Sequence, residues 1–276
     1  MREVLSRPQT RRRLRVLGFV VLAIGAGWAF AALDLDLAAL SLRPVLLNLL
    51  VLSPLNLLLA AMTLQLSAAA LQRPMALRLA TTRTAQAALA ELLPLPGGAM
   101  VRGAALVEAG ASAPAAASMV IATALLTLAM TLTGAGFALV VLGLPLGWAL
   151  MLGAGLGLLL VVAGMTRRVA IRLIAAMVGL RILTITLSIV RLLASLAALG
   201  QTGTVVQALL YTVATTLGAS VGIVPGGFGL NESLAAGLAQ MIDASPAAAF
   251  MAVALNRCLD LVAAAALSAL TGWRAS

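Results

Sequence analysis

The most specific chemical pattern in the sequence is a glycine-rich run inside an apolar region, residues 225–232, which read PGGFGLNE. Glycine lets the backbone turn tightly and approach a ligand closely. A helix that restarts near Asn231 would expose free backbone N–H groups that attract anions, and Asn231 could cap it. The run predicts either an anion site or a hairpin tip packed on a neighbouring helix without a ligand. Its candidate site residues are Gly226, Gly227, Gly229, Asn231 and Glu232.

Charged side chains within the last apolar stretch form a second pattern. Asn256, Arg257 and Asp260 lie three or four positions apart, so they share one face of a helix. A charge inside a membrane span costs about 3 kcal/mol or more. Two interpretations follow: Arg257 and Asp260 form a structural pair that fixes helix packing, or Arg257 binds a lipid phosphate.

Glu232 places an acid at the start of the same inferred helix, which disfavours a simple anion site there. We expect it to pair with Arg257 or Arg181, or to carry a coupling proton. Arg181 and Arg191 stand ten positions apart, about 15 Å along a helix. They either extend to the two membrane interfaces or form a ladder for phosphate.

A similar glycine pair occurs earlier in the chain. Gly97 and Gly98 follow Pro96, and Arg102 comes four positions after them. Arg102 is expected near the tip of a first hairpin, where it contacts a phosphate or pairs with Glu91 or Glu108.

The composition of the chain indicates that these residues lie in a membrane protein. The 276 residues are 63% hydrophobic and 9% charged, which suits solvation by lipid and not by water. Aromatic residues are too few for nucleic-acid binding, although the net charge is +10. The lone Cys258 and the lack of His remove disulfide, zinc and Ser-His-Asp chemistry, so we expect no enzyme and no cofactor.

The apolar stretches predict an all-α polytopic membrane protein forming one domain over residues 1–276. About 20 apolar residues cross a bilayer. Six spans are expected, at about 14–33, 44–66, 115–141, 146–165, 177–199 and 246–271. Glycine and proline interrupt two further stretches, at about 84–109 and 205–242.

The arginine distribution orients these spans. With a cytoplasmic N-terminus, thirteen of the 18 basic residues, all of them Arg, fall on the cytoplasmic side or at the termini. This holds only if both interrupted stretches return to the side they entered from. We therefore predict two re-entrant helical hairpins and cytoplasmic termini in a bacterial-type inner membrane.

The two interrupted stretches also resemble each other. LPLPGGAMVRGAAL is followed by ASAPAAASMVIA, and GIVPGGFGLNESL by DASPAAAFMAVA. Chance similarity is the competing explanation, because the pieces are short and Ala-rich. Three spans and one hairpin per half, at about 1–142 and 143–276, would make an inverted repeat, a recurrent plan of transporters.

VPGGFGLNE, LPGGAMVR and the closing NRCLD together resemble the lysylphosphatidylglycerol synthase transmembrane-region family, over about residues 85–135 and 205–272. The resemblance implies a flippase-like protein that moves an anionic or amino-acylated phospholipid between leaflets. The chain departs from the family pattern where an Arg/Asp pair is common, since Thr123, Thr127 and Thr131 stand there. The family's soluble aminoacyl-transferase domain is absent from this sequence, so lipid synthesis is not implied.

Three functions remain open from the sequence. The first is a lipid transporter whose cleft holds the head group of an anionic phospholipid, using Arg102, Arg257 and glycine backbone. The second is a transporter of a small anion or metabolite. The third is a non-transporting partner of a membrane enzyme that modifies lipids or glycans. A homo-oligomer or a membrane enzyme partner is compatible with each.

Overall fold

A computed structural model describes residues 41–92, 97–221 and 229–273, together with residues 24, 25, 27, 28 and 31. Within these residues every regular element is helical. Five helices are long and apolar enough to cross a membrane: Leu42–Ala70, Ala113–Val141, Leu146–Thr166, Ile171–Ala198 and Pro246–Leu270. The predicted all-helical, membrane-type fold is confirmed at this level, while the expected span at 14–33 lies almost wholly outside the described residues.

The first long helix has three parts: α3 (Leu42–Leu47), a π-helical turn η2 (Asn48–Leu52) and α4 (Ser53–Ala70). The remaining elements follow in this order: α5 (Leu77–Ala90), α6 (Gly97–Glu108), α7 (Ala113–Val141), α8 (Leu146–Thr166), α9 (Ile171–Ala198), α10 (Val205–Val221), α11 (Leu230–Gln240) and α12 (Pro246–Trp273).

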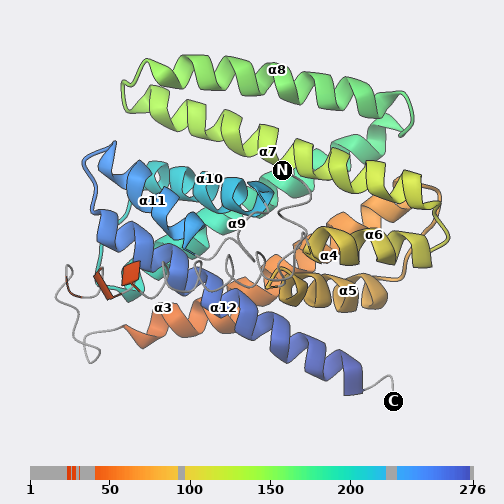
Figure 1. Ribbon diagram of the computed structural model, residues 1–276, viewed down its shortest axis with the longest axis horizontal. Coiled ribbons are helices and arrows are strands. Elements are labelled where there is room, and N and C mark those ends of the chain that lie inside the picture. The colour runs from red at the N-terminus through yellow and green to blue at the C-terminus, as the bar shows by residue number, and fades with distance from the viewer. Residues whose placement is uncertain are drawn as a thin grey trace, which may run out of the picture.

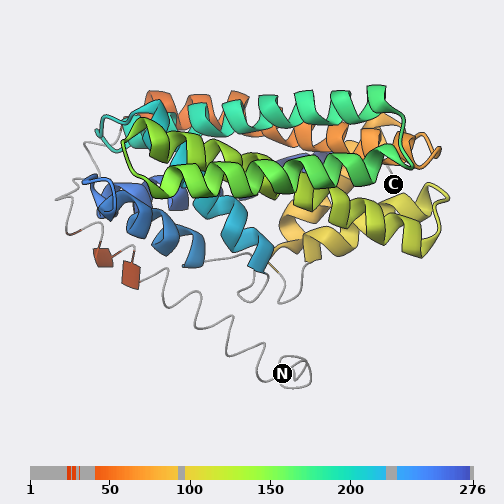
Figure 2. The same cartoon turned by 90° about the horizontal axis from the view of Figure 1, so that it is seen from above.

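Both interrupted stretches form pairs of short helices, α5 with α6 and α10 with α11, and each pair packs together. Figure 2 shows that the two pairs enter the bundle from opposite ends, so that their inner ends face each other near the middle. The long helices α4, α7, α9 and α12 pack against them. Irregular backbone inside a membrane is tolerated where it is buried in protein or lines a cavity.

The loops collect at two ends of the bundle (Figure 1). One end carries the loops after α4, α6 and α8, and with them Arg73, Arg167 and Arg168. The loop after α4 lies against the loop after α6, because a Cβ atom placed on Gly110 would be 3.5 Å from Cδ of Arg73. The opposite end carries the loops after α7, α9 and α11, the last of which holds Asp243.

Helices α7 and α8 form an antiparallel pair at one side of the bundle (Figure 1). They approach closely at Gly136 and Gly147, where a Cβ on either would overlap backbone of the other helix. The outer side of α8 exposes Leu152, Leu156 and Leu159. This helix has the apolar, unpacked surface that lipid chains solvate.

The fifth expected span begins earlier than the sequence suggested, at Ile171 and not at residue 177. Arg172 lies in the first turn of α9 with its side chain exposed, so the helix forms without burying that charge.

Candidate anion-binding cavity

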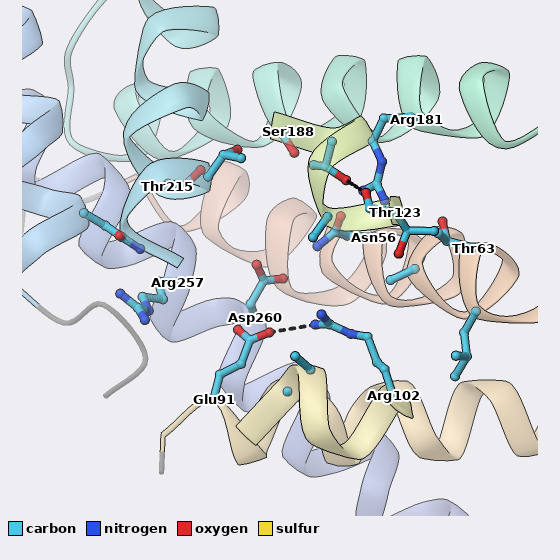
Figure 3. Close-up of a pocket in the computed structure, with 18 of the residues that line it drawn as sticks. Asn56, Thr63, Glu91, Arg102, Thr123, Arg181, Ser188, Thr215, Arg257 and Asp260 are labelled. Atoms are coloured by element: carbon cyan, nitrogen blue, oxygen red, sulfur yellow. Dashed lines mark hydrogen bonds and ion pairs between the residues drawn. The ribbon is translucent and has the colours of Figure 1, made fainter. Parts of the chain in front are cut away.

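A cavity of about 550 Å³ opens between the two helical pairs. Its walls come from α4, α6, α7, α9, α10, α11 and α12. Figure 3 shows charged side chains that reach it from different walls, with Arg181 on one side and Arg102 and Glu91 on another. The charged lining residues are Arg102, Arg181, Arg191, Arg257, Glu91 and Asp260. These four guanidinium groups and two carboxylates leave an excess of two positive charges.

The first helical pair carries an ion pair at its inner end. Arg102 Nη2 on α6 lies 2.7 Å from Glu91 Oε1, directly after α5. Glu91 was one of the two partners expected for Arg102. Glu108, the other, pairs instead with Arg83 at 2.6 Å. Both members of the Arg102–Glu91 pair remain partly exposed, so Arg102 can still face a ligand in the cavity.

Gly97 and Gly98 allow this ion pair to form. They begin α6 and are buried against the end of α5. A Cβ at Gly97 would overlap the carbonyl oxygen of Ala90, and one at Gly98 would lie 2.7 Å from Glu91 Oε1. Only glycine permits the two helices to approach this closely.

The second helical pair restarts differently from the sequence prediction. The residue before α11 is Gly229, with φ +76°, and Asn231 lies inside the first turn. Asn231 is therefore not the cap that we expected. Glu232 is fully buried in the first turn of this helix, where the helix dipole favours a negative charge. The N-terminus of α11 thus already holds an anion of its own chain.

Glu232 also meets an arginine from the following helix. Arg257 Nη1 lies 3.5 Å from Glu232 Oε1, which confirms one of the two expected partners. Arg257 reaches the cavity, whereas Glu232 is behind it and is not among the lining residues. Arg181, the other expected partner of Glu232, does not form this pair.

One of the two interpretations of these charges was an Arg257–Asp260 pair, but the ion pair of Asp260 is with Arg191. Asp260 Oδ1 lies 2.6 Å from Arg191 Nη2 on α9. Arg257 and Asp260 share a face of α12, but Arg257 meets Glu232 on α11 and Asp260 meets Arg191 on α9. Arg191 is only 2% exposed, so the expectation that it extends to a membrane interface is wrong.

A buried polar cluster holds Arg191 in place. Its Nε donates to Asn48 Oδ1 at 3.1 Å and its Nη2 donates to Ser53 Oγ at 3.1 Å. Asn48 Nδ2 in turn donates to Asn256 Oδ1 at 3.3 Å. A buried ion pair is favourable only when such additional hydrogen bonds satisfy its remaining donors and acceptors.

Asn48, which begins the π-helical turn of the first long helix, was not predicted as a site residue. Such a turn widens a helix locally and is frequent at functional sites. The available signal was the appearance of Asn48, Ser53 and Asn56 within one apolar stretch, on a span that needs no polar residue.

Arg181 differs from the other three arginines of the cavity. No carboxylate lies within ion-pair distance of it among the residues that the structure describes. Arg181 lies on α9 and is half-buried in the cavity wall (Figure 3). A guanidinium without an internal counter-ion is the group most available to an anionic ligand.

The structure brings some of the predicted site residues together in the cavity wall and leaves others outside it. Gly97, Gly98, Arg102, Arg181, Asn231, Arg257 and Asp260 line the cavity. Gly229 and Glu232 form the start of α11 behind it. Gly226 and Gly227 lie outside the described residues.

Hydroxyl groups also line the cavity, and none of them was predicted as a ligand. Thr63, Ser67, Thr123, Thr127, Ser188 and Thr215 all line the cavity. No family model matches this chain, and a search of curated proteins found no match either.

Proposed function

We propose that this protein is an integral membrane transporter of flippase type, which moves a phospholipid or another anionic lipid between leaflets. The main support for this proposal is the cavity between the two helical pairs, which four arginines line. Arg181 has no carboxylate partner in the described part of the chain. A phosphate there would receive charge-assisted hydrogen bonds. The lipid tails would stay in the bilayer, and the resemblance to a flippase-like family agrees with this function.

We further propose that the two halves form an inverted repeat, and the contacts between helices support this. Helix α4 packs on α5 as α9 packs on α10, and α6 packs on α7 as α11 packs on α12. The first helix of each short pair also contacts the long helix that follows the other pair, α5 with α12 and α10 with α7. This correspondence relates the segment α4–α7 to the segment α9–α12. Transporters with inverted halves bind substrate where the halves meet.

The repeat predicts a definite topology, with the Arg-rich end of the bundle in the cytoplasm of a bacterial-type cell. Reporter fusions after Gly200 and after Asp243 should read outside, and a fusion after Gly110 should read inside. Two complementary reporters, one active only in the cytoplasm and one active only outside it, measure on which side of the membrane each fusion point lies. An outside reading at Gly110 would contradict the re-entrant hairpin and with it the inverted repeat.

Arg181→Gln tests the function directly. Loss of a charge-assisted contact to phosphate should slow lipid movement by roughly tenfold or more. The protein is reconstituted in vesicles that contain phosphatidylglycerol with a fluorescent acyl chain, and dithionite quenching of the outer leaflet reports movement across the bilayer.

Arg172→Gln is the matched control, because Arg172 is exposed on the same helix and does not line the cavity. It should move lipid at the wild-type rate. Equal rates in the wild type and Arg181→Gln would refute the assigned role of Arg181. Uptake of a soluble anion without lipid movement would favour the small-anion transporter, and neither activity would favour a non-transporting partner of a membrane enzyme.

A further inference from the structure

The hydroxyl groups of the cavity present acceptors and not donors. Thr63, Thr127 and Ser188 each donate their hydroxyl proton to the carbonyl four residues earlier, at 2.9, 2.7 and 2.9 Å. Ser67, Thr123 and Thr215 make equivalent bonds within their own helices. A hydroxyl that has donated its only proton still has two lone pairs, so it can accept from a ligand.

The carboxylates of the cavity are already engaged. Glu91 pairs with Arg102 at 2.7 Å, and Asp260 pairs with Arg191 at 2.6 Å. An arginine already balances the charge of each carboxylate, which weakens the attraction of either one for a ligand ammonium. The charge of Arg181, which no carboxylate in the described chain balances, opposes an ammonium further.

Aromatic rings, the other common receptor for ammonium groups, are absent from the described lining. None of the described residues that line the cavity is Phe, Tyr or Trp. Cation–π recognition is therefore not offered by this part of the wall.

We infer that the transported head group is a polyol phosphate, that is, a phosphate bearing neutral hydroxyl groups such as glycerol, inositol or a sugar. The inference rests on the proposed function and specifies its substrate class. The phosphate of the head group contacts Arg181. The hydroxyl groups of the head group donate hydrogen bonds to the Thr and Ser oxygens that line the cavity. Thr123 and Thr127 lie one turn apart on α7, and both line the cavity together with Arg181.

Two lipids of equal charge test this directly. Phosphatidylglycerol and phosphatidylmethanol are both monoanionic phosphodiesters, but only the first carries free hydroxyls. In reconstituted vesicles the wild type should move fluorescent phosphatidylglycerol about three- to tenfold faster, the contribution of one or two hydrogen bonds. Phosphatidylethanolamine, the ammonium probe, should move more slowly than phosphatidylglycerol.

The double substitution Thr123→Val with Thr127→Val should remove the preference and bring phosphatidylglycerol to the phosphatidylmethanol rate. Thr133→Val is the control, because Thr133 makes the same kind of bond on α7, to Ala129 O at 2.8 Å, and does not line the cavity. It should keep the wild-type preference. The ratio of the two rates within one preparation is the readout, since it does not depend on how much protein folds.

The outcomes separate this inference from the function on which it rests. Equal movement of both anionic lipids by the wild type would overturn the polyol inference and leave anionic-lipid transport intact. Faster movement of phosphatidylethanolamine would also overturn it. If no lipid moves, the proposed function fails, and uptake of radiolabelled glycerol 3-phosphate then decides: accumulation supports a soluble polyol phosphate as ligand, and its absence overturns the polyol assignment.

Discussion

Arg191→Met should lower the free energy of unfolding by about 3–5 kcal/mol, because it leaves the Asp260 carboxylate in a protein interior without its counter-charge. The change also removes the donors that Asn48 and Ser53 accept from. Methionine keeps much of the volume of the side chain, so loss of charge dominates over loss of packing. Thermal or denaturant unfolding in detergent measures the effect.

Arg191→Met combined with Asp260→Asn should recover most of that stability, because no unpaired charge remains. The two single changes are expected to be strongly non-additive, as partners in one network are. Arg257→Met combined with Asp260→Asn is the control, since Arg257 pairs with Glu232. Stronger coupling of Asp260 with Arg257 than with Arg191 would contradict the pairing seen in the structure.

Apolar length alone predicted the long helices. The expected spans 44–66, 115–141 and 146–165 differ from the observed helices by only a few terminal residues at each end. The physical reason is that a helix needs about 20 apolar residues to cross a bilayer, and a run of that length can be recognised directly in the sequence. The interruptions were equally visible, because glycine and proline cannot continue a helix without cost.

Ion-pair partners could not be predicted in the same way. Arg257 and Asp260 are neighbours on one helix face, which made them appear paired, yet each meets a residue from another helix. Asn48 and Arg191 are 143 positions apart in the sequence and still form the centre of the polar cluster. Such contacts depend on how far each helix is shifted and rotated against its neighbours, and a single sequence carries no direct record of that.

The glycine pairs illustrate both cases. Sequence analysis placed Gly226 and Gly227 at a tight tip, and these two lie outside the described residues. Their counterparts Gly97 and Gly98 are described, and the reason for glycine there is close approach to α5, not a positive φ. The residue type was therefore informative, while the cause required the packing of the two helices.

Gly97→Ala should consequently abolish most lipid transport, whereas Gly103→Ala on the same helix should not. The added methyl at Gly97 overlaps the Ala90 carbonyl, which is backbone and cannot rotate away, so α5 and α6 must separate. Overpacking of this kind costs about 1–3 kcal/mol. The separation would also break the Arg102–Glu91 pair at the cavity wall.

At Gly103 no atom lies within 4 Å of the added carbon, so alanine meets open space and gains up to about 1 kcal/mol from its better helix propensity. Gly98→Ala should be intermediate, since it contacts the movable Glu91 side chain at 2.7 Å and the Ala87 carbonyl at 3.1 Å. Transport rates in vesicles and unfolding midpoints should both follow the order Gly103→Ala, Gly98→Ala, Gly97→Ala, from least to most impaired. Equal tolerance at all three positions would show that close contact between α5 and α6 is not required, because the same methyl group is added to the same helix each time.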